Sequence, residues 1–289
     1  MAEISVSTTR PARRILPLGI VLPAIVVGFY ILAAAIGPIL LGFNPVATSL
    51  ADRLKPPMTT LASGSLSLLG TDAVGRDLLA QILAGARISL AVGAATLVLA
   101  SLIGVTLGVI AGYRGGWIDA VVMRVADIQL GFPSILLAVL VAAVIGPSLT
   151  NVILVLAVTR WVVFARVARA QTLTVKARTF VDASRTLGAT DSHIIINCIL
   201  PALVAPILVV ATVQFGLVIV AEASLSFLGL GLPVGIPTWG GTISAGRNYL
   251  ANAWWISTMP GIALSILVIC VGILGDTLRD RLDPNLITR

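Results

Sequence analysis

The stretch IQLGFPSILLAVLVAAVIGPSLTNVILVLAVT, residues 128–159, contains no charged side chain and decides the fold class. A helix needs about 20 apolar residues to cross a bilayer, so this stretch is too long for one crossing. The sequence Gly146-Pro147-Ser148 interrupts it, and proline cannot continue a helix without losing a hydrogen bond. We therefore predict two membrane spans here, at residues 128–146 and 150–169.

The rest of the chain has the same apolar character. Of its 289 residues, 58% are hydrophobic and 11% are charged, against about 25% charged residues in soluble domains. So few charges cannot cover the surface of a soluble globule, and the composition also excludes a disordered chain. Further apolar runs predict four more spans, at residues 15–42, 88–112, 202–228 and 256–275. The predicted fold is an all-α integral membrane protein with six transmembrane helices.

The positions of the basic residues predict the orientation in the membrane. The chain has 19 Lys and Arg residues against 12 Asp and Glu, a formal net charge of +7. Because the basic residues lie between apolar runs, we expect no nucleic-acid partner. With the N-terminus inside, 5 of the 19 basic residues lie outside and the other 14 inside, as the positive-inside rule requires. We expect a multi-pass protein of the cytoplasmic (inner) membrane with both termini cytoplasmic and an uncleaved first span.

This orientation assigns each connecting segment to one side of the membrane. From N- to C-terminus we predict a cytoplasmic tail (1–14), a first span (15–42), an external loop with an interfacial helix (43–87), a five-helix core (88–275) and a cytoplasmic tail (276–289). Within the core, residues 176–201 form a cytoplasmic loop and residues 229–255 a second external loop. Loops of this length usually carry function.

The cytoplasmic loop contains the pattern of a short amphipathic helix. Phe180, Ala183 and Leu187 recur at helical spacing and share one face. Gly188 follows directly, and glycine suits the left-handed residue that ends many helices. We therefore predict a helix that stops at Gly188.

A second short helix is expected after this glycine. Thr190 or Asp191 can cap its N-terminus, and Pro201 is expected to end it. Two helices joined at a bend would form an elbow on the cytoplasmic face. Such an elbow can fit a groove on a partner protein, or it can lie on the lipid headgroups as an ordinary interfacial helix pair.

Within this loop, Asp182-Ala183-Ser184, then Gly188, then Leu200-Pro201 resemble the EAA loop of ABC importer permeases. The spacing places Gly188 and Leu200-Pro201 in register with that pattern. Asp182 stands where the family has glutamate, and Ser184 where it has a second alanine. The acidic charge, the small side chain and the elbow glycine are kept.

Other segments are similar to the second permease of dipeptide, oligopeptide and nickel importers. They are Leu69 through Asp77, Gly85 through Leu90, Asp127 through Pro133, Glu222 through Gly231 and Pro237 through Gly240. The resemblance extends over residues 40–285. It implies the fold of a type I ABC importer permease and no enzymatic activity in this chain.

The resemblance also implies a function and a set of partners. The chain would be a permease subunit that translocates dipeptides or short oligopeptides, with nickel or another peptide-like solute as the alternative cargo. It would pair with a homologous second permease in the membrane lipid, with one or two ATP-binding subunits, and with an external substrate-binding protein. No GxxxxGK[ST] phosphate loop occurs in the sequence, so ATP and Mg would be held by the partner subunits and no cofactor by this chain.

The resemblance implies that the elbow carries ATP-driven movement to the membrane helices. The residues expected to couple to the ATPase are Phe180, Asp182, Ala183, Ser184, Leu187, Gly188, Leu200 and Pro201. Candidates for the substrate path are Arg160, Gln214 and Glu222. Candidates for contact with the external binding protein are Asp72, Arg76, Asp77 and Trp239.

Each of the polar candidates also has a simpler interpretation. Arg160 can meet a substrate carboxylate in the path, or it can extend to the membrane surface or pair with the second permease. Glu222 can meet a peptide's amino group, but a hydrogen bond or ion pair that fixes the following loop is the favoured interpretation. For Asp72, Arg76 and Asp77, local charge pairing is favoured over contact with another protein.

Two other classes of function have less support. An ion-driven secondary transporter would need acids or interrupted helices near mid-bilayer, where Arg160 is almost the only polar group. A membrane enzyme would need a catalytic pair, yet His193 is the sole histidine and no GxSxG motif occurs. Cys198 and Cys270 form no CxxC pair, so we expect no metal site.

Overall fold

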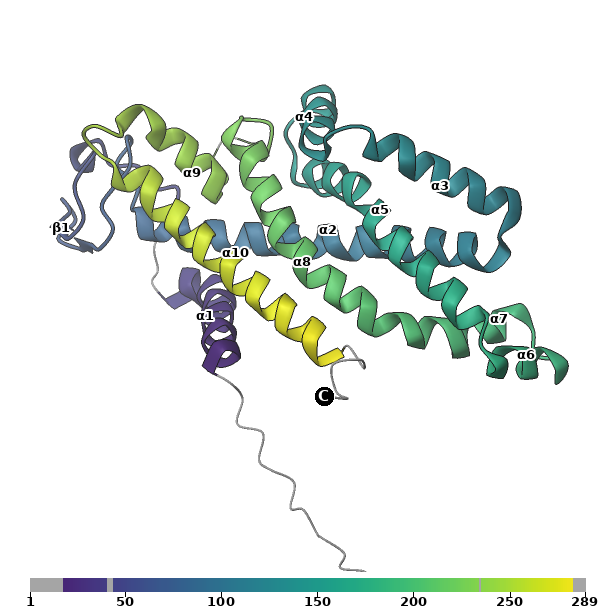
Figure 1. The fold of residues 1–289 in the computed structure, drawn as a ribbon. Coiled ribbons are helices and arrows are strands. Elements are labelled where there is room, and N and C mark those ends of the chain that lie inside the picture. Colours follow the sequence, from purple (N-terminus) through teal and green to yellow (C-terminus); the bar gives the residue numbers. More distant parts are fainter. Residues whose placement is uncertain (1–17, 41–43, 234, 283–289) are drawn as a thin grey trace, which may run out of the picture.

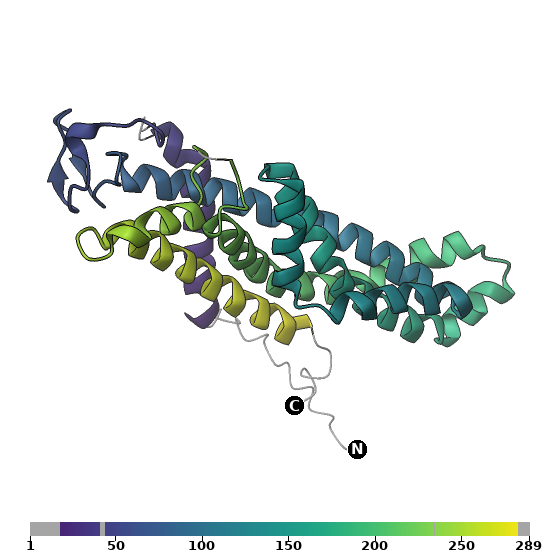
Figure 2. The same ribbon diagram turned by 90° about the horizontal axis from the view of Figure 1, so that it is seen from above.

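A computed structural model describes residues 18–40, 44–233 and 235–282 as an elongated helical bundle (Figure 1). The expected tail 1–14 and the last residues of the tail 276–289 lie outside this part of the chain. A small hairpin lies at one end of the bundle and helices α6 and α7 at the other, in both views (Figures 1 and 2). The two ends therefore correspond to the predicted external and cytoplasmic sides.

Within the described residues, five helical runs are long and apolar enough to cross a membrane. They are α1 (Leu18–Leu40), α2 (Leu78–Arg114), α5 (Leu149–Lys176), α8 (Leu200–Phe227) together with the helical turns before it, and α10 (Trp255–Leu282). A sixth crossing is present if the bent pair α3 (Gly116–Leu130) and α4 (Ser134–Ile145) counts as one span. The predicted all-helical membrane fold is confirmed.

The bent pair corrects the span predicted at residues 128–146. Helix α3 already begins at Gly116, and α4 turns away from it by 88°. Pro133 lies in the break; it lacks a backbone N–H and disfavours helical geometry in the residue before it. Hydropathy gave no sign of this bend, because the uncharged run that begins at Ile128 continues through the break.

The external segment before α2 also differs from the prediction. In place of an interfacial helix, the described residues 44–77 contain a 3₁₀ turn, η1 (Leu50–Asp52), and a hairpin of β1 (Thr59–Thr60) with β2 (Leu66–Ser67). Helix α2 begins at Leu78 and not near residue 88, because Asp77 caps it by accepting a hydrogen bond from the Ala80 N–H at 3.0 Å. Residues 78–87, which the prediction placed in the external loop, therefore form the first turns of α2.

A row of glycines lets α2 and α5 pack closely. A Cβ atom at Gly104 or Gly108 would clash with backbone atoms of α5, and at Gly112 it would lie 3.0 Å from the Arg169 carbonyl oxygen. Small residues four apart on one helix face are a common basis of close helix contact in membranes, because they let the two backbones approach. This seam, formed by Gly104, Gly108 and Gly112, fixes α2 against α5.

The helix after the cytoplasmic elbow is continuous with the membrane span. Helix α7 (Asp191–Ile194) passes through a π-helical turn, η2 (Ile195–Ile199), directly into α8. The prediction that Pro201 ends a helix is therefore wrong. Pro201 lies in the first turn of α8, where a missing N–H costs little. The π turn just before the proline absorbs the change in hydrogen bonding.

Candidate functional site

The elbow is built by α6 (Thr179–Thr186), a glycine bend and α7. Gly188 has φ +87°, and the N–H groups of Gly188 and Ala189 donate to the carbonyls of Arg185 and Ser184 at 2.9 and 3.0 Å. This is the Schellman arrangement, in which a left-handed residue closes the helix end. Thr190 Oγ1 then accepts the His193 N–H at 3.3 Å and caps α7, as predicted.

Apolar side chains fix the elbow to the ends of the membrane helices. Val181, Ile194 and Ile199 are fully buried, and they share one cluster with Val109 of α2 and Val175 of α5. The elbow is thus a rigid extension of three membrane-spanning helices. A displacement of the elbow must move the ends of α2, α5 and α8.

The Tyr113 side chain adds a polar staple at the same junction. The side-chain hydroxyl donates to Asp191 Oδ1 at 2.6 Å, and the backbone carbonyl oxygen of Tyr113 accepts from Lys176 Nζ at 2.5 Å. The Arg185 guanidinium lies 5.7 Å from the centre of the Tyr113 ring. A hydrogen bond with the Tyr113 side chain raises the pKa of Arg185, which favours its charged form.

The opposite face of the elbow is open. Leu187 is 88% exposed and Phe180 is 47% exposed, and Ala183 is also exposed, so the apolar face predicted from the sequence points away from the bundle. A recess of about 430 Å³ lies beside it, lined by Ser184, Leu187, Gly188, Ala189, Thr190 and His193. An exposed apolar knob beside a recess is the shape of a docking surface.

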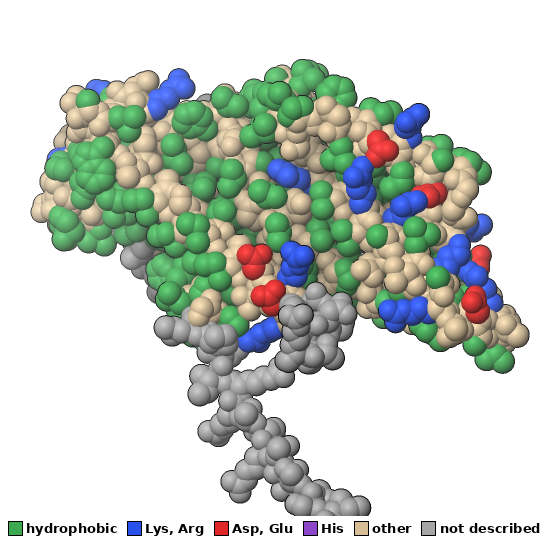
Figure 3. Space-filling view, viewed as in Figure 1, with side chains coloured by type: hydrophobic (Ala, Val, Ile, Leu, Met, Phe, Trp, Pro, Cys, Tyr) green, Lys and Arg blue, Asp and Glu red, His purple; other side chains and the backbone are tan. Residues whose placement is uncertain are grey.

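The remaining coupling candidates lie around this surface. Asp182 is exposed, and its nearest cation among the described residues is Arg185, 4.0 Å away. Leu200 and Pro201 are exposed on the first turn of α8, below the π turn. Charged side chains also gather toward this end of the molecule, whereas hydrophobic side chains cover most of the rest of the face shown in Figure 3.

Glu222, a candidate for the substrate path, is fully buried. Its two carboxylate oxygens accept hydrogen bonds from Ser89 of α2 at 2.9 Å and from Ser226 at 2.7 Å. The carboxylate therefore joins α2 to α8 near their external ends, and it is not open to a peptide. This geometry corrects its assignment to the path and agrees with a structural role.

Arg160 and Gln214, the other two path candidates, lie deeper in the bundle. Arg160 is half-buried on α5 and Gln214 is buried on α8. Arg160 Nε and Gln214 Oε1 are buried atoms that have no hydrogen-bond partner among the described residues. Both atoms are shielded from solvent in this conformation, so a group from outside the chain reaches them only when the helices move.

Three of the four candidates for external contact are used inside the chain. Trp239, at the start of α9 (Trp239–Gly246), is fully buried and donates from Nε1 to the Ile82 carbonyl at 2.9 Å. Asp72 is 7% exposed and accepts from the N–H groups of Val74 and Arg76. Asp77 caps α2, as described above. The structure thus corrects the expected contact by Trp239 and supports local pairing for the two aspartates.

Arg76 is the exception at this end. It is half-buried, and its Nε has no partner among the described residues. It lines a polar recess of about 250 Å³ together with Ser226, Thr238, Thr242 and the loop around Pro233. Asp72 also lines this recess, but of the four candidates only Arg76 has a buried polar atom without a hydrogen-bond partner in the described part of the chain.

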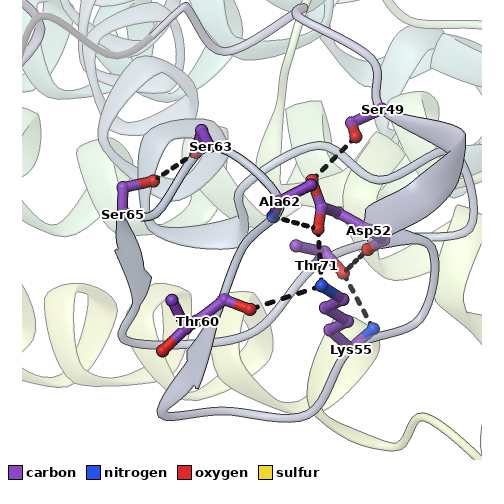
Figure 4. Close-up of polar contacts among 8 residues, drawn as sticks. All are labelled: Ser49, Asp52, Lys55, Thr60, Ala62, Ser63, Ser65 and Thr71. Atoms are coloured by element: carbon purple, nitrogen blue, oxygen red, sulfur yellow. Dashed lines mark hydrogen bonds and ion pairs between the residues drawn. The ribbon is translucent and has the colours of Figure 1, made fainter.

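An ion pair that the sequence analysis missed organises the external loop. Asp52 accepts hydrogen bonds from Lys55 Nζ at 2.6 Å, from Ser49 Oγ at 2.7 Å and from the Ala62 N–H at 2.7 Å (Figure 4). These donors, Lys55 first, hold the pKa of Asp52 at about 2, below its usual 3.8. The Asp52–Lys55 spacing of three residues was a signal that could have been read.

The fold and the elbow together define a membrane permease subunit with a cytoplasmic docking surface. A family model described as "Binding-protein-dependent transport system inner membrane component" matches residues 104–288. The chain belongs to this family. It is therefore a membrane-spanning transport component and not an enzyme, and the expected resemblance to ABC importer permeases is confirmed.

Curated relatives and solved structures agree with this assignment. The chain is 42% identical to a putative peptide transport system permease protein of Brucella suis biovar 1 (strain 1330), over 95% of this chain and 89% of the relative. It is 38% identical to the dipeptide transport system permease protein DppC of Alkalihalophilus pseudofirmus, over 91% and 84%. A structure of the inward-facing MetNI methionine ABC transporter matches 70% of this chain and 96% of its own with a TM-score of 0.57. At 21% identity, that match concerns the fold alone.

Proposed function

We propose that this chain is one of two permease subunits in an ATP-driven importer of dipeptides or short oligopeptides. The observation that carries the proposal is the elbow: an exposed apolar knob, Leu187 and Phe180, on a base that is fixed to three membrane helices. Such a knob is suited to a groove on an ATP-binding subunit. The peptide cargo rests on the relatives, which are named for peptide and dipeptide transport.

Movement of the elbow would reach the membrane through two connections. The first is covalent, because α7 continues through the π turn into α8. The second is the packing of Val181 and Ile194 against α2 and α5, reinforced by the Tyr113–Asp191 hydrogen bond. When the ATP-binding subunits close, the elbow would move as a rigid body and change which side of the membrane the path faces.

The other partners follow from this arrangement. A second, homologous permease would complete the path in the membrane, and one or two ATP-binding chains would hold ATP and Mg on the cytoplasmic side. An external binding protein would deliver the peptide at the hairpin end, where Arg76 lines an open recess. Both termini would face the cytoplasm, in agreement with the distribution of basic residues.

The test is peptide uptake by the complete importer in proteoliposomes, with ATP hydrolysis measured in parallel. Gly188→Pro should abolish uptake and its link to hydrolysis, because proline cannot adopt the φ of +87° at this bend. Reversal of charge by Asp182→Arg should weaken the same link without changing the fold, since Asp182 is exposed. Gly229→Pro is the matched control: it introduces the same backbone strain at a positive-φ glycine of the external end, and it shows whether such strain alone prevents assembly. Uptake and stimulated hydrolysis that survive both elbow substitutions would refute the coupling role.

A further inference from the structure

Three polar side chains inside the membrane bundle have a buried atom without a hydrogen-bond partner in the described part of the chain. They are Thr96 Oγ1 on α2, Arg160 Nε on α5 and Gln214 Oε1 on α8. A buried polar group without a partner is unfavourable, and water is scarce within a bilayer. Three such groups on neighbouring helices indicate a partner that comes from outside the chain.

Two apolar clusters place the three groups in the same part of the bundle. The cluster nearer the external side includes residues of all three helices, among them Val92, Leu156 and Val218. The cluster nearer the cytoplasm does the same, with Ala100 and Phe164 and, packed against them, Ala211. Both clusters therefore join α2, α5 and α8.

Thr96 and Gln214 lie between core residues of these two clusters on their own helices, and Arg160 follows Leu156 of the first cluster and Ala157 of the second. Each is separated by three or four residues from one member of either cluster, which places it on the same helical face. We call these three residues the polar layer. It lies where the two clusters meet, since Leu97 packs against both.

The depth of the polar layer can be estimated from α5. Arg160 follows the first residue of α5, Leu149, by 11 positions, a rise of about 16 Å. The hydrocarbon core of a bilayer is about 30 Å thick, so Arg160 lies near its middle. An arginine at this depth faces a water-filled path or a partner and marks a functional site. It has no ion pair among the described residues.

The chemistry of the polar layer restricts what can bind there. A guanidinium only donates hydrogen bonds and is always charged, so it selects an anion and repels a metal cation. Gln214 Oε1 only accepts, so it requires a donor beside that anion. Glu222, two turns away on α8, does not supply the anion: it forms no ion pair with Arg160, and its carboxylate is hydrogen-bonded to Ser89 and Ser226.

The C-terminal end of a peptide carries both groups side by side: an α-carboxylate and the N–H of the last peptide bond. We infer that the polar layer binds this end of the cargo during translocation, with Arg160 on the carboxylate and Gln214 on the amide N–H. The inference rests on the proposed function and adds to it the part of the peptide that the permease recognises. A carboxylate from the second permease is the competing partner for Arg160.

The test compares alanyl-alanine with alanyl-alanine amide, in which a neutral amide replaces the α-carboxylate. Uptake is measured in proteoliposomes with the complete importer, at concentrations that saturate the binding protein for each peptide. The wild type should take up the free acid at least about tenfold faster than the amide. Arg160→Gln should reduce this ratio to near one by slowing only the free acid, while Arg160→Lys should keep part of it.

Two further variants make the test specific. Arg166→Gln removes a guanidinium six positions along α5 that pairs with Asp127, and it should leave the ratio unchanged. Gln214→Met should slow the acid and the amide equally, because both peptides keep the last N–H. Co-purification with the partner subunits checks the assembly of every variant, and Arg160→Lys keeps the test valid if Arg160→Gln does not assemble.

The outcomes are distinguishable. Equal slowing of both peptides by Arg160→Gln would overturn the inference and assign Arg160 to the second permease. Unchanged uptake of both peptides by that variant would overturn it as well. If the assembled wild type hydrolyses ATP but takes up neither peptide, the proposed cargo is refuted and the inference fails with it.

Discussion

The two ends of this molecule use their side chains in opposite ways. At the external end the aspartates are bonded within the chain: Asp52 to Lys55, Asp72 to two backbone N–H groups, and Asp77 to the start of α2. At the cytoplasmic end Leu187 and Asp182 are exposed. The contrast teaches that the external end is stabilised by its own contacts, whereas the cytoplasmic elbow is rigid at its base and open at its tip.

The largest effect on uptake should come from a substitution at the exposed tip of the elbow. Leu187→Asp places a charge on a side chain that is 88% exposed, so the fold should survive and docking should not. We expect uptake by the complete importer to fall at least about tenfold, the size typical of a central interface residue. Leu250→Asp is the matched control at the external end, where Leu250 is 53% exposed. Equal losses from both substitutions would remove the distinction between the two ends.

The next largest effect is on stability, and it concerns the glycine seam between α2 and α5. Gly108→Ala should destabilise the protein by about 1–3 kcal/mol, because the new Cβ meets the backbone of α5. Gly272→Ala makes the same substitution in α10, where nothing lies within 4 Å, and should leave stability unchanged or higher. Thermal unfolding of the detergent-purified protein measures both. Equal melting temperatures for the two variants would contradict the close packing of α2 and α5.

A smaller effect should come from the base of the elbow. Tyr113→Phe removes the hydroxyl that donates to Asp191 at 2.6 Å and should cost about 1 kcal/mol locally. Hydrogen exchange of residues 179–194 should then rise by about fivefold, while exchange at the hairpin stays the same. In an Asp191→Asn background the same substitution should matter less, because the charged acceptor is already lost. A uniform increase over the whole chain would point to global destabilisation instead.

The smallest effect is confined to low pH at the external end. The hydrogen bonds and charge of its neighbours lower the pKa of Asp52 to about 2, so its ionised form stabilises the native loop. That stabilisation is complete above the ordinary value of 3.8 and is lost as the pH falls toward 2. Limited proteolysis between residues 49 and 67 should therefore increase over this range only. Asp52→Asn should abolish the pH dependence, and a wild type with no change over this range would contradict the assignment.

The sequence predicted those features that depend on local pattern. Apolar runs located the long helices, and Gly188 with the spacing of Phe180 and Leu187 predicted the elbow and the shared face of its apolar residues. Hydropathy could not predict the 88° bend, since it does not report the direction of a helix. The Tyr113–Asp191 hydrogen bond joins residues that are far apart in the chain, so no local pattern encodes it.

The external end shows the same limit. Trp239 looked like an interface residue, because tryptophan is common at membrane surfaces. Its burial follows from packing of α9 against α2, where Gly85 leaves room for the ring. Likewise, Thr96 has no motif of its own. Its place in the polar layer can be recognised only from the two clusters that flank it in the structure.

The central claim is that the tip of the elbow contacts an ATP-binding subunit. A photo-cross-linking amino acid at position 187 tests it in the assembled importer, with position 250 as the reference site. We predict a cross-link from position 187 to the ATP-binding subunit whose yield changes with nucleotide, and none to that subunit from position 250. Cross-links from position 187 to lipid alone, at the same yield with and without nucleotide, would contradict the account.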